Sequence, residues 1–317
     1  MKRTLLALAG LLAMSAGAAA FPDRPIQVIV PWAAGGGTDT VVRIFAAGFE
    51  KELGVPVNVV NRPGGNGVAG HSAIATATPD GYTLGAASPE IAFYKTLGTA
   101  DITPESFDLF SRLAVIPAGV TVKADAPWKT LQDLLKAVKE APPGTMTSSG
   151  TGTGGSWHIA SGGLLKAAGL EADRVRWVPS QGGAPALQDV TAGGVTMFTG
   201  SPIEAKPLLE AGRVRTIVMM TEERAPGFPD VPTTKEAGVD WVYSNWFALV
   251  APKGIPADRR KVLFEAAKRA HARAEVQDTL KARGIQPVWD EPGTFETYAA
   301  EFAAKGNAVL KDLGLAR

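Results

Sequence analysis

The sequence predicts an α/β protein of two lobes, each a mainly parallel sheet flanked by helices, with two strands crossing between the lobes. Three observations support this class. A chain of 317 residues exceeds the size that one core comfortably serves. Apolar strands alternate with amphipathic helices from Phe21 to about Ile116, and the alternation restarts near Val120. The chain then returns through 246–250 to two long helices, so it needs two connections between the lobes.

In the first half, the pattern is that of a βαβαβ unit. Residues 26–30 are apolar on both faces, as in a buried parallel strand. The helix after Asp39 carries Phe45 and Phe49 on one stripe, and Gly54 ends it. The elements expected in this half are strands at 26–30, 57–60 and 82–85, a helix from about 39 to 53, and a helix of small residues through Ala77.

The second half repeats this organisation. Its expected elements are helices at 128–140, 157–168, 184–192 and 203–211, and strands at 145–148, 174–179, 195–198 and 215–220. After the return strand, two apolar stripes with helical spacing are interpreted as ordinary core faces. They are Leu263, Ala266, Ala267, Ala270 and Ala274 on one helix, and Phe295, Tyr298, Ala299 and Phe302 on the other. We expect lobe one to comprise 21–120 plus 246–317, and lobe two to comprise 121–245.

Residues 1–20 have the pattern of a signal peptide. Lys2 and Arg3 precede an apolar run from Leu5 to Met14, and small residues suited to signal peptidase follow. The apolar run is too short to span a bilayer, and no second stretch is long enough. We therefore expect an exported, soluble protein that starts at Phe21. Because Lys2 and Arg3 supply two positive charges, the chain without them has a formal charge of −1 instead of +1, which leaves no global field for nucleic acid or acidic membranes.

The composition narrows the chemistry further. There is no cysteine, so the sequence predicts no disulfide, no lipid anchor through a thiol and no cysteine-ligated zinc. The three histidines, at 71, 158 and 271, are too scattered for a histidine metal cage. His71 and His271 have no partner visible in the sequence and are interpreted as structural or solvent-facing. We expect neither a metal nor a cofactor.

A glycine-rich turn joins the first strand to its helix, with the sequence Pro31-Trp32-Ala33-Ala34-Gly35-Gly36-Gly37-Thr38-Asp39. It lacks both the Gly-Lys-Ser/Thr of a Walker loop and the G-x-G-x-x-G fingerprint, which disfavours dinucleotide binding. Taken alone, it fits a tight turn with Thr38 or Asp39 as helix N-cap. Its three glycines and two alanines, however, leave backbone N–H groups nearly bare at the positive end of a helix dipole, where they can hold an anion.

A second glycine-rich turn, at 144–156, opens the helix at 157–168. Its serines and threonines add hydroxyl groups to the glycine N–H groups. The composition alone fits a flexible surface loop, but the position between a strand and a helix favours a binding turn. Two such turns, one from each half of the chain, predict a site that holds a small anion between the lobes.

Several side chains near these turns allow two interpretations. Ser156 and His158 suggest a nucleophile and its base, but G-x-S-x-G is absent and positions i and i+2 diverge on a helix, so His158 is interpreted as a helix-start residue that bonds locally. Trp32 and Trp157 either pack in the core or stack on an aromatic or hydrophobic ligand. Asp39 caps its helix or binds a ligand ammonium, and capping is the favoured interpretation.

Several segments together resemble one protein family. They are 21–26 (Phe-Pro-Asp-Arg-Pro-Ile), 29–39, 61–65 (Asn-Arg-Pro-Gly-Gly), 79–84 (Pro-Asp-Gly-Tyr-Thr-Leu), 183–187 (Gly-Ala-Pro-Ala-Leu) and 230–233 (Asp-Val-Pro-Thr). In this order, over essentially the whole mature chain, they resemble the extracytoplasmic solute receptors of tripartite tricarboxylate transporters, the Bug family. The resemblance implies a type II periplasmic-binding-protein fold and a periplasmic receptor that delivers an organic carboxylate to integral-membrane permease subunits. It also implies that the turns at Trp32–Asp39 and Ser149–His158 hold the ligand carboxylate.

The chain departs from this family pattern near the expected site. The family often has Tyr-Lys-Gly where this chain has Ser180-Gln181-Gly182, and it usually has an aspartate within 194–197. The loss of a lysine and an aspartate makes the expected pocket more neutral, so a second carboxylate on the ligand does not follow. Trp157 is bulkier than the expected residue, which suits an aromatic acid or simply shrinks the site.

The sequence therefore predicts a non-enzymatic, monomeric receptor for a small organic carboxylate, with no nucleic-acid partner. Two rival interpretations stay open: a ligand-responsive sensor partner of a two-component system, and a periplasmic hydrolase. The residues predicted to bind the ligand are Trp32, Ala33, Ala34, Gly35, Gly36, Gly37, Thr38, Asp39, Ser88, Ser149, Gly150, Thr151, Gly152, Thr153, Gly154, Gly155, Ser156, Trp157, His158, Ser180, Gln181 and Gly182.

Overall fold

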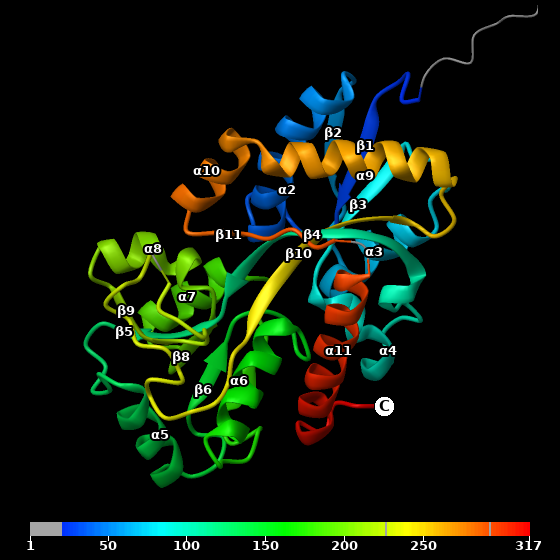
Figure 1. The fold of residues 1–317 in the computed structure, drawn as a ribbon. Helices are drawn as coiled ribbons and strands as arrows, with labels where there is room; N and C mark the ends of the chain where they lie inside the picture. Colours follow the sequence, from blue (N-terminus) through cyan, green and yellow to red (C-terminus); the bar gives the residue numbers. More distant parts are fainter. Residues whose placement is uncertain (1–20, 226, 292) are drawn as a thin grey trace, which may run out of the picture.

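The computed structural model describes residues 21–225, 227–291 and 293–317, which form two β-sheets flanked by helices (Figure 1). This arrangement confirms the predicted two-lobed α/β class. The signal peptide predicted at 1–20 lies outside the described residues, and the residue bounds predicted for the two lobes stay a prediction. Within the described residues, no helix combines the length and the apolar character needed to cross a membrane.

Sheet A has six strands, of which four run in the same direction. The six are β1 (Ile26–Val30), β2 (Val57–Asn61), β3 (Thr83–Ala87), β4 (Phe107–Pro117), β10 (Ser244–Pro252) and β11 (Gln286–Pro287). Their order is β11-β4-β10-β3-β1-β2. Strand β1 is parallel to β2 and β3, whereas β10 is antiparallel to β3 and β4, and β11 is antiparallel to β4.

Sheet B has five strands: β5 (Gly119–Lys123), β6 (Thr147–Ser149), β7 (Arg176–Val178), β8 (Met197–Gly200) and β9 (Val214–Met219). Their order is β7-β6-β8-β5-β9. Strand β6 is parallel to β7 and β8, whereas β5 is antiparallel to β8 and β9.

Both sheets are therefore mixed, but β1 to β4 of sheet A and β6 to β9 of sheet B each run in one direction, which agrees with the predicted mainly parallel sheets. A helix that crosses over a sheet returns the chain parallel to the strand it left. This rule holds for β1, β2 and β3 in sheet A and for β6, β7 and β8 in sheet B, which the sequence pattern predicted as strands alternating with helices. The antiparallel pairs involve β4, β5, β9 and β10, which carry the chain between the two sheets, and the short β11.

The helices lie close to their predicted positions. Around sheet A they are α2 (Gly37–Leu53), α3 (Val68–Ala75), α4 (Tyr94–Leu97), α9 (Ala257–Ala272), α10 (Ala274–Ala282) and α11 (Thr294–Asp312), with 3-10 turns η1 (Gly65–Gly67), η2 (Pro89–Ala92) and η3 (Pro104–Ser106). Around sheet B they are α5 (Leu131–Glu140), α6 (Ser156–Ala167), α7 (Gly183–Ala192) and α8 (Pro202–Glu210). The helix expected to carry Ala274 ends earlier, because Arg273 adopts extended backbone (φ −62°, ψ 132°) and Ala274 begins α10.

Strand β10 shows how sheet A is covered on both faces. Its alternate residues Phe247 and Leu249 join the core beneath α2 and α9, whereas Trp246 and Ala248 join the core on the α3 and α11 side. All four side chains are buried. This double burial explains why the strand reads as a continuous apolar run in the sequence.

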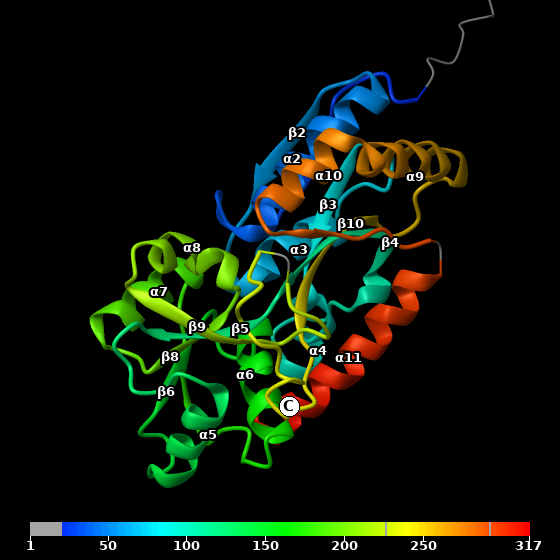
Figure 2. The same cartoon turned by 60° about the vertical axis from the view of Figure 1, so that its left-hand side comes forward.

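The two connections between the sheets lie side by side at a narrow waist. Ala118, between β4 and β5, donates its N–H to Tyr243 O at 3.0 Å and accepts from Met220 N–H at 2.8 Å. Tyr243 N–H in turn donates to Met220 O at 2.9 Å. The predicted pair of crossings is thus one hydrogen-bonded unit, and β10 leads from it into sheet A (Figure 2).

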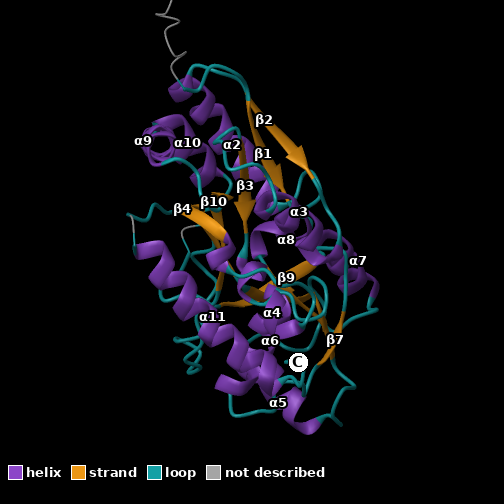
Figure 3. Ribbon diagram, turned by 90° about the vertical axis from the view of Figure 1, so that its right-hand side faces the viewer, coloured by secondary structure: helices purple, strands orange, loops and turns teal. Residues whose placement is uncertain are grey.

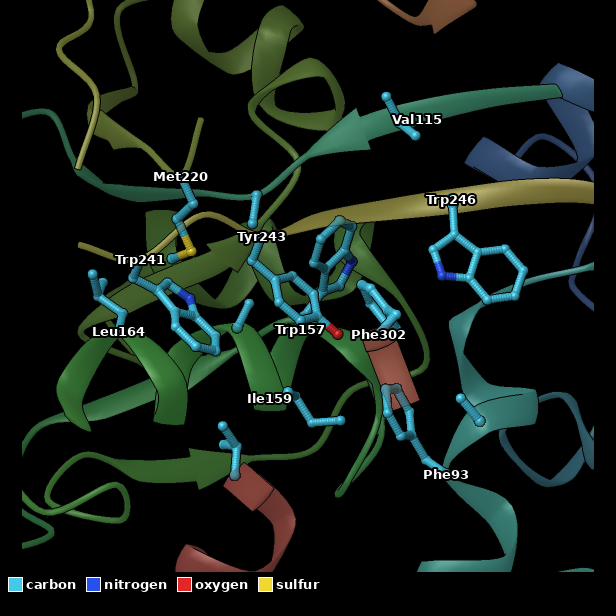
Figure 4. Packing of buried hydrophobic residues seen from close by; sticks show 14 of the residues in the cluster. Phe93, Val115, Trp157, Ile159, Leu164, Met220, Trp241, Tyr243, Trp246 and Phe302 are labelled. Carbon is cyan, nitrogen blue, oxygen red and sulfur yellow. The ribbon is translucent and has the colours of Figure 1, made fainter. Parts of the chain in front are cut away.

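One hydrophobic core continues across this waist. The cluster that contains Trp246 of sheet A also contains Trp157 and Ile159 of α6 and Val218 of β9 (Figure 4). Helix α11 packs along α6, as Figure 3 also shows: a Cβ added to Gly162 would lie 3.2 Å from Leu313. The two halves are therefore joined by apolar packing as well as by chain connections.

Candidate functional site

The first glycine turn lies at the carboxyl end of β1 and opens α2. Gly35 has a φ of +82°, and Gly36 is the N-cap of the helix, so the expectation that Thr38 or Asp39 would be the N-cap was wrong. The residues from 33 to 36 are exposed, whereas Thr38 is buried. A Cβ at Gly37 would lie 3.4 Å from Ile116 and 3.5 Å from Phe247, which places the turn against the two strands that lead into the waist.

Asp39 holds this turn in shape. Its carboxylate accepts hydrogen bonds from Gly35 N–H (2.9 Å), Arg43 Nε (2.9 Å) and Asn61 Nδ2 (2.8 Å), and Asn61 also donates to Trp32 O at 3.0 Å. Burial alone would raise the pKa of Asp39, but these hydrogen bonds together lower it. The carboxylate is 3% exposed, so it acts as a clamp on the turn.

The start of α2 leaves backbone donors without an internal partner. Within the described residues, no carbonyl accepts from the N–H of Gly37 or Thr38, as expected for the first turn of a helix. Both N–H groups lie at the positive end of a helix of 17 residues. With Asp39 occupied by Arg43, Gly35 and Asn61, this helix start can accept an external anion.

The second glycine turn follows β6 and opens α6. Gly150 is enclosed so tightly that a Cβ there would lie 2.4 Å from Thr199 O. On either side of it, Ser149 Oγ and Thr151 Oγ1 are buried and have no hydrogen-bond partner within the described chain. Thr153 is exposed at the tip. The turn therefore presents two hydroxyl groups that nothing in the described chain satisfies.

The first N–H group of α6 is bonded from within the protein. Ser156 N–H donates to Glu90 Oε1 at 3.3 Å, and Ser88 Oγ donates to Glu90 Oε2 at 2.7 Å. Trp32 Nε1 donates to Ser88 Oγ at 3.1 Å. Burial raises the pKa of Glu90, which is 3% exposed.

The hydroxyl of Ser156 continues this buried network to the waist. It lies 2.9 Å from Tyr243 Oη and also bonds to Asn245 Oδ1. Ser88 and Ser156 thus use their polar groups inside the protein, and in this conformation they connect the two glycine turns. Glu90 was not among the residues predicted from the sequence.

His158 bonds locally, as interpreted from the sequence. Its Nδ1 accepts from Gly154 N–H at 3.1 Å, and its ring stacks on Trp177 with the centroids 4.6 Å apart. Burial lowers the pKa of His158 to about 4, so the ring is neutral at pH 7. The polar atoms of Ser156 and His158 face different partners and form no nucleophile–base pair. Trp157 is 4% exposed and packs in the core, which is the first of its two interpretations.

The other two histidines are structural. His71 is fully buried, with Nδ1 2.9 Å from Tyr94 Oη, and burial lowers its pKa to about 3. His271 Nε2 lies 2.8 Å from Leu113 O. In the part of the chain that the structure describes, no group of three or more histidine or acidic residues could hold a metal ion.

A third segment, 180–182, joins the second turn. Ser180 N–H donates to Thr151 O at 3.0 Å, and Trp177 Nε1 donates to the same carbonyl at 3.2 Å. Ser180 Oγ donates to Gly182 O at 3.0 Å, while Gln181 is exposed. The structure thus brings 180–182 together with the turn at 149–156, as the sequence predicted.

The two halves touch at Asn66, which sequence reasoning did not select. Asn66 has a φ of +54° within η1. A Cβ at Gly152 would lie 3.1 Å from Asn66 Oδ1, and one at Gly155 would lie 3.4 Å from Asn66 Nδ2. The glycine turn at 61–67, which contains the 61–65 segment of the family resemblance, therefore borders the same region as the two predicted turns.

Sequence comparison identifies a family for the chain. A family model described as "Tripartite tricarboxylate transporter family receptor" matches residues 41–315. A protein from the gbd 5′ region of Cupriavidus necator is 33% identical over 313 residues, covering 97% of this chain and 94% of that protein. Protein BugT of Bordetella pertussis is 29% identical over 321 residues, covering 98% of this chain and 97% of BugT.

Structure comparison agrees with this assignment. MatC from Rhodopseudomonas palustris with bound malate has a TM-score of 0.81 at 28% identity, covering 92% of this chain and 100% of that chain. Rpa4515 from R. palustris with adipate has a TM-score of 0.83 at 26% identity, covering 93% of this chain and 99% of that chain. The predicted resemblance to the Bug receptors is confirmed, and the chain belongs to the tripartite tricarboxylate transporter receptors, a family of solute-binding proteins.

Proposed function

We propose that this protein captures a small organic carboxylate between its two glycine turns and delivers it to a tripartite tricarboxylate-type membrane transporter. The observation that carries the proposal is the start of α2, where the N–H groups of Gly37 and Thr38 have no partner within the described chain and Asp39 is already occupied. A helix start with free donors favours an anion.

The second turn supplies further donors for the same ligand. The hydroxyls of Ser149 and Thr151 are buried and have no partner within the described chain. Asn66, from the half that contains sheet A, lies next to Gly152 and Gly155 of this turn. A helix start contributes roughly 0.3–1 kcal/mol to an exposed anion and about 2 kcal/mol to a partly buried one. Micromolar binding needs about 8 kcal/mol, so donors from both halves and apolar contacts must act together.

Two relatives of the same fold carry carboxylates in their structures, malate in one and adipate in the other. For this chain we infer the same chemical class of ligand, a small organic carboxylate, without a commitment to two carboxylates. We also propose that the protein is exported with removal of residues 1–20, acts as a monomer without catalysis, and meets integral-membrane permease subunits in its ligand-bound form.

The direct test is calorimetric titration of the purified protein with a panel of monocarboxylates, dicarboxylates including malate and adipate, tricarboxylates, amino acids and aromatic acids. Thermal unfolding of the same samples gives an independent readout, because a ligand that binds the folded state raises the melting temperature by mass action. We expect one or a few acids to bind and to raise the melting temperature. Absence of binding across the whole panel would refute the proposal.

The transport step needs its own test. Uptake of the acid identified by titration into membrane vesicles that contain the permease subunits should depend on added receptor. Vesicles that accumulate the acid equally well without the receptor would contradict the proposed role in delivery while leaving carboxylate binding intact.

A further inference from the structure

Glu204 stands in the first turn of α8, at the junction of two helix starts. Its carboxylate lies directly against Gly183, the first residue of α7: a Cβ on Gly183 would lie 2.2 Å from Glu204 Oε2. Helix α8 itself begins beside the waist, because a Cβ on Gly119 would lie 2.6 Å from Pro202. The position of Glu204 is thus fixed by its contact with the start of α7 and by the packing of Pro202 against Gly119 at the waist.

This position borders the proposed ligand site. Segment 180–182, which leads into α7, is bonded to the second glycine turn through Ser180 N–H and Thr151 O. On the other side, Ile203 packs against the core of sheet A and touches Gly284, where a Cβ would lie 3.4 Å away. In Figure 1, α8 lies next to α10 and β11 of the half that contains sheet A.

The carboxylate of Glu204 is left without a partner in this setting. Within the described residues it forms no ion pair and no hydrogen bond, although Asp39 and Glu90, the other two acids near the site, each have several partners. Glu204 is accessible to solvent, yet the surrounding protein desolvates it enough to raise its pKa to about 7. An accessible carboxylate with no partner of its own in the described chain can accept a hydrogen bond from a ligand.

We propose that Glu204 determines the ligand class of the site, by accepting a hydrogen bond from an amino or hydroxyl group on a monocarboxylate and by disfavouring dicarboxylates. This inference rests on the proposed function. The physical reason is charge: the donors at the start of α2 neutralise one carboxylate of the ligand, and an ionised Glu204 repels a second one. An ammonium or hydroxyl group at the far end of the ligand instead satisfies Glu204.

The proposal also predicts a dependence on pH. Once protonated, Glu204 no longer repels a second carboxylate and can donate a hydrogen bond to it, so dicarboxylate affinity should fall as the pH rises through about 7. Burial lowers the pKa of His71 to about 3 and that of His158 to about 4, and it also lowers the pKa of His271.

Lys206 of α8 and Arg283, next to Gly284, form no ion pair within the described residues, whereas the charged groups on β5, β9 and α7 have other positions or partners. Arg215 of β9 donates to backbone carbonyls at 124, 126 and 128, and Lys123 of β5 pairs with Asp125. On α7 the acidic residue is Asp189, near the far end of the helix from Gly183. Among the buried acids close to the site, Glu90 also has a raised pKa, so its contribution must be separated by mutation.

The experiment titrates wild type, Glu204→Gln and Glu210→Gln with acids matched in chain length: malonate, succinate, glutarate and adipate against the ω-amino and ω-hydroxy monocarboxylates of the same length. Glu210 lies at the other end of α8, so Glu210→Gln is the control for the same chemical change on the same helix. Titrations at about pH 6 and about pH 8 add the charge readout, and Glu90→Gln tests the other buried acid.

At about pH 8 we expect wild type and Glu210→Gln to prefer the donor-bearing monocarboxylate over its matched dicarboxylate by about tenfold or more, which corresponds to ~1.4 kcal/mol. Glu204→Gln should abolish this preference and flatten the pH dependence of dicarboxylate binding. If Glu90→Gln does the same while Glu204→Gln does not, the effect belongs to Glu90 and the proposal is overturned. If acids bind but Glu204→Gln keeps the wild-type preference and pH profile, Glu204 does not select the ligand. If no acid binds wild type, the proposed function itself fails.

Discussion

The Glu90 carboxylate occupies the start of helix α6, where its Oε1 accepts the N–H of Ser156 at 3.3 Å. Glu90 belongs to η2 beside sheet A, whereas α6 covers sheet B, so a buried side chain of one half neutralises a helix dipole of the other. The Ser156 N–H is therefore not available to a ligand at the second glycine turn.

The burial of Glu90 predicts how stability responds to pH. Burial raises the pKa of Glu90 above its usual 4.5, so the folded state binds the proton more tightly than the unfolded state. The stabilisation is fully present below about pH 4.5 and is lost as the pH rises through the folded-state pKa. Glu90→Gln should remove this loss, so its free energy of unfolding in urea should fall less than that of wild type between about pH 5 and about pH 8.

Glu90→Ala is the matched control. It leaves the Ser156 N–H without a partner and should cost about 1–3 kcal/mol at every pH. Wild type and Glu90→Gln unfolding free energies that change in parallel with pH would show that Glu90 does not carry the effect.

The donor role of the first turn can be tested on a single N–H group. Gly37 is the first helical residue after the N-cap Gly36, where proline fits a helix, and Gly36 has the extended backbone (φ −75°, ψ 174°) that a following proline requires. Gly37→Pro should therefore fold normally but bind the carboxylate about tenfold more weakly, since a hydrogen bond to a charged group contributes about 1.5–3 kcal/mol.

Gly37→Ala adds a Cβ at the same place, 3.4 Å from Ile116, but keeps the N–H. Calorimetric titration of both variants separates the loss of a donor from the added bulk. Equal affinities for Gly37→Pro and wild type would mean that this N–H does not contact the ligand.

The two serines of β6 predict opposite effects on stability. Ser148 Oγ lies 2.8 Å from Thr199 Oγ1, so Ser148→Ala should cost about 1 kcal/mol of unfolding free energy. Ser149 Oγ is buried without a partner in the described chain, so Ser149→Ala should be neutral or slightly stabilising and should weaken carboxylate binding. A large stability loss for Ser149→Ala, with binding unchanged, would show that its hydroxyl serves the fold rather than the ligand.

The tight packing around Gly150 predicts that the second turn tolerates no side chain there. Gly150→Ala would bring Cβ to 2.4 Å from Thr199 O, and we expect a loss of roughly 1–3 kcal/mol or more together with weaker binding. Gly194→Ala is the control, because its Cβ would lie at an ordinary 3.5 Å from Asp189 O. Thermal unfolding of the two variants gives the comparison, and similar melting temperatures would contradict the prediction.

The elements built on local pattern could be predicted from the sequence. Strand β1 has the predicted bounds because its four apolar residues are buried on both faces, and α2 ends at Leu53 because Gly54 adopts the left-handed conformation (φ 70°). The local bond of His158 followed from its place at a helix start.

Features that depend on distant parts of the chain could not be predicted in this way. Strand β4 pairs antiparallel with β10 across more than a hundred residues, and no local period encodes the direction of that pairing. Nothing in the local sequence distinguishes Glu90 from other acidic residues, because its partner Ser156 lies 66 positions away in the chain. Trp157 had two balanced interpretations because only tertiary packing decides which face of α6 is buried.

The apolar core that runs through the waist has a consequence for how this protein comes apart. Trp157, Ile159 and Val218 belong to the same buried cluster as Trp246 of the opposite half. A fragment cut at the predicted lobe boundaries would therefore expose these apolar side chains to water. Denaturation should thus proceed as a single cooperative event rather than one half at a time. We therefore expect any opening that admits a ligand to hinge at this apolar core, with the contact between α6 and α11 kept while the two glycine turns move apart.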